Sequence, residues 1–340
     1  MALVKNPQDI RLAMIGMVEG NGHPYSWSAI INGDYDPEAM AQCGYPVIPQ
    51  YLGAEPKENL GIPGVKVTHV WCDDPRDAER VARAARIPNV VRCPEDVIGR
   101  VDAVIIPTDK GSEHVERARP FVEAGLPLFV DKPLADCEDH LRQFVRWCRQ
   151  GRPILSTSCM RYAREYRQIR DRIADVGELR AISMTMSKSW ERYGIHALEG
   201  VYPFLAPGGW ESVTNTGTDA ANIVHLRHSC GVDVVVMNIT DLYGGFGCLN
   251  VYGTKGWLGT PFKDTFYAFK AQLAAFVEYL RTGRLPFPFE ETVELIAMVI
   301  AGIRSRQEGG RPVRLSEIRT GQEEASEVPS QSRAGQASGR

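Results

Sequence analysis

The sequence contains no apolar run long enough to span a membrane, no Cys-x-x-Cys pair and no excess of basic residues. Its formal net charge is −3 and its isoelectric point is about 6.2. The lack of a long apolar run argues against a membrane-spanning protein. The lack of basic excess argues against binding to nucleic acid or to an anionic membrane surface. We therefore expect a globular protein whose partners are small molecules or copies of itself.

The eight cysteines are scattered, and several lie inside apolar runs, as small buried thiols do. The first eleven residues lack the apolar core of a secretory signal. We interpret the cysteines as reduced and expect a cytoplasmic location. The length of 340 residues, with 44% hydrophobic and 24% charged residues, predicts one large or two ordinary domains.

The first part of the chain alternates short apolar runs with helical patterns. The expected strands are 12–16, 67–73, 101–107 and 126–131, and the expected helices are 25–31, 76–86 and 112–124. This alternation is typical of βαβ units and a parallel sheet. Residues 32–65 are rich in Gly, Pro and Tyr and are interpreted as an insertion.

The pattern changes after Pro133. We expect helices at 136–149, 165–176, 262–281 and 290–306, a short strand at 154–159, and β-rich runs at 181–187, 221–227, 232–240 and 246–252. The β-rich runs lack predicted intervening helices, so they predict an antiparallel sheet. We place one domain at 1–134 and a second at 135–320, followed by a disordered tail at 321–340.

A glycine-containing loop follows the first strand and precedes the first helix. Gly16, Gly20, Asn21 and Gly22 lie in it. Glycines here let the backbone approach a pyrophosphate at a helix N-terminus. The spacing departs from Gly-x-Gly-x-x-Gly, so a plain turn is the alternative. The position after the first strand of a βαβ series favours a dinucleotide site.

Polar residues also follow the second and third strands. Asp73 ends the second strand, where an acid accepts the ribose hydroxyls of NAD, and Asp74 is placed to cap the next helix. Arg76 offers a contact for a 2′-phosphate, so NADP remains an alternative to the favoured NAD. Pro107 and Thr108 either line the nicotinamide side or form a tight turn.

Asp131-Lys132-Pro133 closes the apolar run that begins at Leu126. Parallel strands carry ligands at their C-terminal ends, and the proline restricts the backbone of Lys132. We therefore predict that Lys132 takes part in chemistry and that Asp131 lies beside it at the cofactor. The alternative is a surface salt bridge between the two side chains.

These residues together resemble the Gfo/Idh/MocA oxidoreductase family. Asp131-Lys132-Pro133 resembles its Glu-Lys-Pro signature, and Gly194 to Glu199 resembles its Gly-x-His-x-x-Asp motif. Met160-Arg161-Tyr162 resembles the Arg-aromatic segment that opens the second domain. The resemblance runs from about 12 to 318. It implies an α/β fold with an N-terminal Rossmann domain and a C-terminal α/β domain that has a large, open, mostly antiparallel sheet.

The resemblance also implies function. It indicates NAD or NADP as the cofactor, a sugar, polyol or derivative as the substrate, and a homodimer or homotetramer that packs through the open sheet. It places Lys132 and His196 at the catalytic centre. We expect the lysine to hold and polarise the substrate oxygen and to share in proton transfer, and the histidine to be the better proton acceptor. Substrate contacts fall to Arg161, Arg192 and Tyr193. No metal ligand is expected.

One departure from the family concerns the position four residues before the histidine. Many members carry an acid there, and this chain has Arg192, with Glu191 next to it. Arg192 could bind a carboxylate or phosphate of the substrate. Equally, it could face solvent while Glu191 or Tyr193 takes the polar role.

The sequence thus predicts an NAD(P)-dependent oxidoreductase that moves hydride between a nicotinamide and a hydroxyl or keto group. One alternative is an enzyme that keeps its cofactor bound and uses transient oxidation for glycoside cleavage or epimerisation. Another is a non-catalytic regulator that senses dinucleotides.

Overall fold

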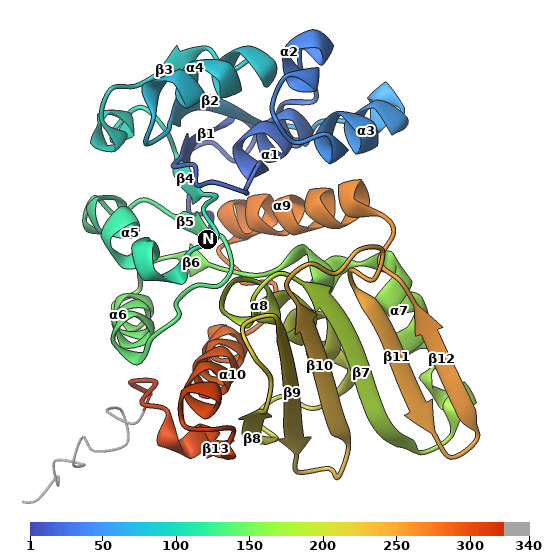
Figure 1. The fold of residues 1–340 in the computed structure, drawn as a ribbon. Helices are drawn as coiled ribbons and strands as arrows, with labels where there is room; N and C mark the ends of the chain where they lie inside the picture. Colours follow the sequence, from blue (N-terminus) through green and yellow to red (C-terminus); the bar gives the residue numbers. More distant parts are fainter. Residues whose placement is uncertain (323–340) are drawn as a thin grey trace, which may run out of the picture.

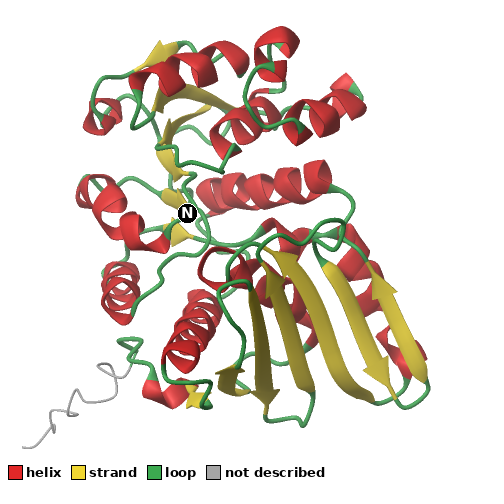
Figure 2. Cartoon of the chain, in the orientation of Figure 1, coloured by secondary structure: helices red, strands yellow, loops and turns green. Residues whose placement is uncertain are grey.

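The structure, a computed structural model, describes residues 1–322. It contains two sheets, one of six strands and one of seven (Figures 1 and 2). The predicted tail at 321–340 lies outside the described residues from 323 onward.

The first sheet is parallel throughout. Its strands are β1 (Ile10–Ile15), β2 (Val65–Trp71), β3 (Asn89–Val90), β4 (Ala103–Ile106), β5 (Leu128–Val130) and β6 (Ile154–Leu155). Their order is β3-β2-β1-β4-β5-β6, so the chain reverses direction across the sheet between β1 and β4. Ligands of such sheets bind at the C-terminal ends of the strands beside this reversal. The predicted parallel sheet is confirmed, and β3 was missed because it has only two residues.

Helices α1 (His23–Asn32), α4 (Pro75–Ala84), α5 (His114–Glu123) and α6 (Glu138–Arg149) connect these strands. Asp74 caps α4 by accepting a hydrogen bond from the backbone N–H of Arg76, as predicted. The parallel sheet extends past the boundary expected at 134, since β6 pairs with β5 through Leu128 and Ile154. The change of pattern after Pro133 marks another crossover helix rather than the end of this sheet.

The insertion at 32–65 has structure of its own. It contains α2 (Pro37–Ala41), which packs beside α4 and α3, and α3 (Val47–Ala54), which packs beside α1. Ile48 of α3 and Tyr45 approach Gly22 so closely that a Cβ at Gly22 would lie 2.6 Å and 2.8 Å from their side chains. The insertion therefore packs against the start of α1.

The second sheet has the order β12-β11-β7-β10-β9-β8-β13. Its strands are β7 (Leu179–Ser187), β8 (Trp210–Asn215), β9 (Ala221–His228), β10 (Asp233–Ile239), β11 (Cys248–Gly253), β12 (Gly256–Thr260) and β13 (Val313–Arg314). Only β7 and β10 pair in parallel, which confirms a mostly antiparallel sheet.

One helix was missed between the β-rich runs. This is α8 (Trp190–Val201), which separates β7 from β8. Its helical signal is weakened by Gly194 and Gly200, and glycine is a poor helix former. Packing requires both: a Cβ at Gly194 would lie 2.5 Å from Trp190, and one at Gly200 would lie 3.0 Å from Met184.

Helices α8 and α10 (Phe289–Gln307) pack against one face of the second sheet (Figure 1). Helix α9 (Thr265–Thr282) lies beside α1 of the first half, and α7 (Arg164–Asp171) lies beside β12. Short 3₁₀ turns occur at Lys57–Asn59, Pro94–Val97, Gly111–Glu113, Cys159–Tyr162, Ile173–Val176, Tyr202–Phe204 and Leu315–Glu317. Among residues 1–322, no helix is both long and apolar enough to cross a membrane.

The contact between α8 and α10 yields a stability prediction. Trp190 is fully buried and donates its indole N–H to Val299 O at 2.9 Å, and a Cβ at Gly302 would lie 2.4 Å from this nitrogen. Overpacking costs about 1–3 kcal/mol, which exceeds the gain of about 1 kcal/mol from alanine in a helix. We expect Gly302→Ala to lower the free energy of unfolding in urea by ~1–2 kcal/mol.

Gly53 of α3 provides a matched control because a Cβ there would meet nothing within 4 Å. Gly53→Ala is expected to raise the free energy of unfolding by up to about 1 kcal/mol. Equal effects of the two substitutions would contradict the packing explanation.

Candidate active site

Lys132 lies two residues beyond β5, at the C-terminal edge of the parallel sheet, and only 1% of it is exposed. Its Nζ lies 3.7 Å from Asp131 Oδ2 and 3.8 Å from Asp109 Oδ2. These distances make ion pairs, but Nζ has no hydrogen-bond partner. The surface salt bridge considered for Lys132 is therefore wrong.

Burial lowers the pKa of Lys132, but the charges of Asp131 and Asp109 outweigh burial and raise the pKa above its ordinary value. The lysine is therefore an ammonium at neutral pH in the protein without cofactor. A charged ammonium donates hydrogen bonds and polarises an oxygen, but it cannot accept a proton.

Asp131 is committed on both oxygens. Its Oδ1 accepts a hydrogen bond from the backbone N–H of Lys132 at 2.7 Å, and its Oδ2 lies 2.8 Å from Nδ1 of His23. His23 is the first residue of α1, and its ring stacks on Trp27 at 4.2 Å. Asp131 is fully buried and therefore connects the lysine to α1.

Asp109 follows β4 and is fully buried. Its Oδ1 accepts a hydrogen bond from Arg192 Nη2 at 2.5 Å, while Oδ2 has no hydrogen-bond partner. Burial opposes ionisation of Asp109, but Lys132 and Arg192 outweigh burial and hold its pKa below the ordinary value. Arg192 thus connects α8 to the loop after β4 through Nη2, while its Nε has no hydrogen-bond partner.

His196 lies on α8 and is 4% exposed. Its Nδ1 lies 2.6 Å from the hydroxyl oxygen of Ser158, and Nε2 makes no hydrogen bond within residues 1–322. Burial, with the charge of Lys132 in second place, lowers the pKa of His196 well below its ordinary value. The ring is therefore neutral. When Nδ1 carries the hydrogen and donates it to Ser158, Nε2 is free to accept a proton.

The ring of Tyr193 lies between the charged residues and the histidine. Its centroid is 4.9 Å from Lys132 Nζ, 4.3 Å from Lys188 Nζ and 4.8 Å from the ring of His196. The Tyr193 hydroxyl accepts a hydrogen bond from Lys188 at 2.7 Å. Predicted residues Lys132, His196 and Tyr193 are thus brought together.

Arg161 is not part of this group. Its guanidinium pairs with Glu199 and with Glu291, and it lies over the ring of Phe287 at 3.9 Å. Glu199 also accepts the backbone N–H of Ser158 at 3.0 Å. Arg161 therefore stabilises the segment that holds Ser158 against His196.

On the cofactor side, the residues fit a dinucleotide. Gly16 and Gly20 have positive φ angles of 100° and 78°, and a Cβ at Gly20 would meet nothing within 4 Å. Asp73 lies past the end of β2, with its side chain 46% exposed, and pairs with Arg117 at 2.9 Å. An open glycine backbone beside an accessible acid is the arrangement that receives a pyrophosphate and a ribose.

The start of α1 offers few donors to an anion. The backbone N–H of His23 donates to the Asn21 side chain at 2.8 Å, Pro24 has no N–H, and that of Tyr25 donates to Gly22 O at 3.1 Å. Asn21 also donates to Pro107 O at 2.9 Å. Asn21 and Gly22, both expected at the cofactor, are thus engaged within the protein.

Thr108 is fully buried and packs against His114, whose Nε2 lies 2.8 Å from Thr108 O. A Cβ at Gly16 would lie 3.0 Å from the Thr108 methyl group. Pro107 and Thr108 therefore form the floor below the glycine loop, and His114 packs inside the fold.

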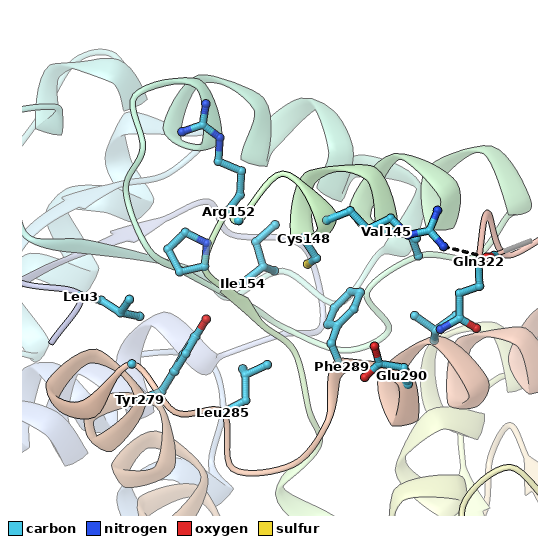
Figure 3. Close-up of a pocket in the computed structure, with 15 residues that line it drawn as sticks. Leu3, Val145, Cys148, Arg152, Ile154, Tyr279, Leu285, Phe289, Glu290 and Gln322 are labelled. Atoms are coloured by element: carbon cyan, nitrogen blue, oxygen red, sulfur yellow. Dashed lines mark hydrogen bonds between the residues drawn. The ribbon is translucent and has the colours of Figure 1, made fainter. Parts of the chain in front are cut away.

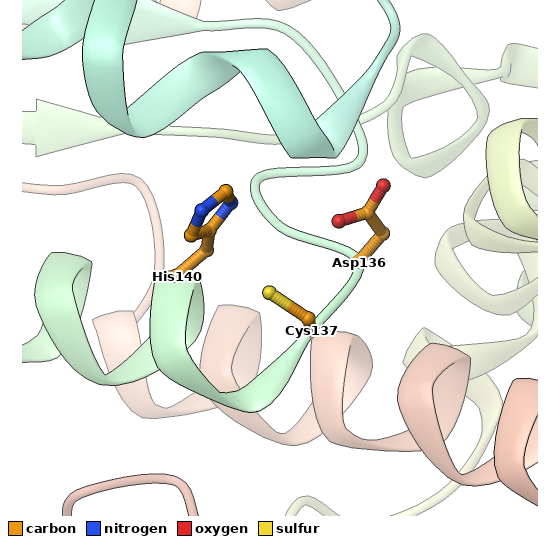
Figure 4. Close-up of side chains that lie close together, drawn as sticks. All are labelled: Asp136, Cys137 and His140. Atoms are coloured by element: carbon orange, nitrogen blue, oxygen red, sulfur yellow. The ribbon is translucent and has the colours of Figure 1, made fainter.

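Two other features lie apart from this site. A cavity of about 430 Å³ opens at the N-terminal end of β6, opposite the edge that carries Lys132, and Tyr279, Phe289 and Arg152 line it (Figure 3). Ligand atoms of Asp136, Cys137 and His140 lie within 4.8 Å of one another (Figure 4). No fourth ligand joins them in the part of the chain that the structure describes, whereas structural zinc sites use four.

The fold and the site together define a two-domain, dinucleotide-binding oxidoreductase. Residues 41–157 match the model of the GFO_IDH_MocA family, described as an oxidoreductase family with an NAD-binding Rossmann fold. This match confirms the predicted resemblance to that family over about a third of the chain, and it supports the predicted class of NAD(P)-dependent oxidoreductase. The matched segment includes Lys132 but neither the glycine loop nor His196.

Solved structures share the fold. A myo-inositol 2-dehydrogenase from Lactobacillus plantarum has a TM-score of 0.70 and 16% identity, covering 90% of this chain and 99% of its own. A myo-inositol dehydrogenase from Corynebacterium glutamicum has a TM-score of 0.67 and 21% sequence identity, and the match covers 90% of this chain and 99% of the other. A scyllo-inositol dehydrogenase from Lactobacillus casei has a TM-score of 0.68 and 13% sequence identity, and the match covers 92% of this chain and 99% of the other. The curated proteins contain no significant sequence match.

Sequence reasoning missed Asp109, His23, Ser158 and Lys188. Asp109 carried a usable signal, because it directly follows Pro107-Thr108 at the end of a predicted parallel strand. The others had none, since each gains its role from a contact that is distant in the sequence: Asp131 for His23, His196 for Ser158 and the glycine loop for Lys188.

The low pKa of His196 yields a prediction for alcohol oxidation, where the neutral ring is the active base. Because its pKa lies well below the ordinary 6.5, kcat/KM should stay level from pH 8 to about 6 and fall only in more acidic solution. The measurement is kcat/KM across this range. His196→Gln is the control, in which the fall of kcat/KM in acidic solution should be absent. A decline centred near neutral pH would contradict the assignment.

Proposed function

We propose that the protein oxidises a hydroxyl group of a sugar, polyol or derivative, or reduces the corresponding ketone, with NAD or NADP. The single observation that carries this proposal is the Lys132 ammonium at the C-terminal edge of the parallel sheet. It is buried between two carboxylates and has no hydrogen-bond partner. The inositol dehydrogenases that share the fold support the substrate class.

Each residue has a separate task in this proposal. A nicotinamide bound there would supply the acceptor for the hydride of the alcohol carbon. Lys132 holds the alcohol oxygen and stabilises the negative charge that develops on it. His196 accepts the hydroxyl proton at Nε2, while Ser158 fixes its ring through Nδ1. Tyr193 contacts both side chains and keeps water from them.

The positive charge for the cofactor phosphates comes from the second domain in this proposal. Lys188 Nζ lies 3.3 Å from Gly20 O of the glycine loop and pairs with no carboxylate among residues 1–322. Its φ of 62° lies in the left-handed region, which is uncommon for a residue other than glycine. Lys188 therefore supplies positive charge to the phosphates, because the backbone N–H groups at the start of α1 already donate within the protein.

At the adenosine end, we propose that Asp73 binds the ribose hydroxyls and favours NAD. Arg76 pairs with Asp74 at 2.7 Å, so a 2′-phosphate would have to compete with that carboxylate for the guanidinium. We also propose that copies of the protein assemble through the open face of the second sheet. Three large apolar side chains of this sheet are exposed, with exposed fractions of 39% for Ile223, 41% for Tyr252 and 64% for Trp257.

Substitution of Lys132 tests the catalytic role. We expect Lys132→Met to reduce turnover by about 10²–10⁴-fold with NAD affinity unchanged. Turnover is followed by nicotinamide absorbance with a panel of sugars and polyols, and affinity by calorimetry. The substitution removes the ammonium that faces both buried carboxylates and leaves them only Arg192 and His23, so a stability loss of up to about 3–5 kcal/mol is expected and is measured by unfolding. Unchanged turnover in folded protein would refute the role.

Substitution of Lys188 tests the cofactor contact. We expect Lys188→Met to weaken NADH binding by about 10-fold and to flatten its dependence on salt, because one charged contact to phosphate is lost. Lys255→Met, at an exposed lysine of the second domain, serves as the matched control. A change in turnover with NADH affinity unaltered would instead assign Lys188 to the support of Tyr193 alone.

A further inference from the structure

Two buried polar atoms face each other in the site without a partner. They are Nζ of Lys132 and Oδ2 of Asp109, on residues that are 1% and 0% exposed. They lie 3.8 Å apart, which is too far for a hydrogen bond between them. A buried donor or acceptor left unpaired is destabilising, and the protein's own residues provide no hydrogen-bonding group for either atom.

We infer that Lys132 and Asp109 bind a second hydroxyl group of a neutral substrate, next to the one whose proton His196 accepts, with Arg192 as the residue that positions Asp109. This inference rests on the proposed function and adds the charge class of its substrate. A hydroxyl oxygen accepts from the ammonium and donates to the carboxylate at the same time. An oxygen about 2.8 Å from each atom completes a triangle with their 3.8 Å separation.

The selection of neutral substrates follows from how the charges are paired. The charge of Arg192 is paired with Asp109, whose Oδ1 accepts from Nη2 at 2.5 Å, whereas Nε has no hydrogen-bond partner. An incoming anion would therefore compete with the Asp109 carboxylate for this guanidinium. Lys132 faces two carboxylates. A substrate carboxylate or phosphate would therefore meet Asp109 as a like charge and would have no unpaired guanidinium to compensate.

The pair also explains why an arginine at position 192 is compatible with a lysine nearby. Asp109 comes from the loop after β4 and Arg192 from the first turn of α8, so the ion pair spans the two domains. Arg192 additionally donates to Glu19 O at 3.4 Å, in the glycine loop. It thereby fixes Asp109 toward Lys132 without touching the substrate.

A ribose hydroxyl of the cofactor has the same chemistry as a substrate hydroxyl, so the experiment must separate the two. We would titrate NADH-loaded protein by calorimetry with myo-inositol, with D-glucose and with D-glucuronate, which carries a carboxylate where glucose has a hydroxymethyl group. NADH affinity is measured separately on each variant. Unfolding curves confirm that each variant is folded.

The wild-type protein is expected to bind the neutral ligands at least 10-fold more tightly than glucuronate. Asp109→Asn should weaken neutral ligands by about 10–100-fold, as expected for one charge-assisted hydrogen bond, and strengthen glucuronate because Arg192 is released. NADH affinity should stay within about threefold of the wild type, since the lost hydrogen bond is to substrate.

The double variant Asp109→Asn with Arg192→Gln separates charge from contact. Its affinity for the neutral ligands should fall as in the single variant. Its affinity for glucuronate should not rise, because the guanidinium is absent. Asp102→Asn is the matched control, since Asp102 pairs with Arg11 at 3.1 Å away from the site. It should leave all affinities unchanged.

Several outcomes would overturn the inference. A wild-type preference for glucuronate, or an unchanged ligand ratio in Asp109→Asn, would refute the neutral hydroxyl site while leaving the dehydrogenase proposal intact. Weakened NADH with unaltered sugar binding would assign the hydroxyl to the cofactor ribose. Binding of none of the sugars and polyols by the NADH-loaded wild type would refute the substrate class itself, and the inference with it.

Discussion

A buried ammonium must be matched by negative charge, and the structure around Lys132 is organised by this requirement. The lysine faces Asp131 and Asp109, and each of these buried acids in turn has a second partner, His23 or Arg192. Removing one member of such a group leaves an uncompensated charge in a site that excludes water. The ends of β4 and β5, the start of α1 and the start of α8 are thereby held in fixed relation.

Helix α8 extends this relation across the second domain. Arg192, His196 and Glu199 are four and three residues apart, which places them on one face of the helix. Along that face they contact Asp109, Ser158 and Arg161 in turn. One helix therefore sets the distance between the buried ammonium and the neutral imidazole. Gly194 leaves room for the Trp190 ring of the same helix, and Gly200 lets the helix approach Met184 of β7 closely.

The sequence predicted the parallel sheet, its main helices and the mostly antiparallel second sheet, because these depend on local periodicity and on turn residues. It also indicated Lys132, His196 and Tyr193, which the fold brings together. It did not predict α8 as a helix, because glycines required for packing lower the local helical signal. It also left the role of Arg192 open, because the partner Asp109 lies 83 residues away and only the folded chain shows the pair.

The irregular glycine loop has a physical explanation in the same contacts. Gly22 lies against Tyr45 and Ile48 of the insertion, Asn21 joins the loop to Pro107, and Pro24 removes a backbone donor. Each feature ties the loop to the protein and takes away a group that usually serves the cofactor phosphates. The neighbouring cations differ in their partners. Lys132 and Arg192 both face carboxylates, whereas Lys188 faces a backbone carbonyl of the loop. A dianionic pyrophosphate is the group that such an unmatched cation favours. On this account, cofactor affinity depends on the second domain as well as on the Rossmann sheet, because α8 and the residue two positions before it join both halves of the site.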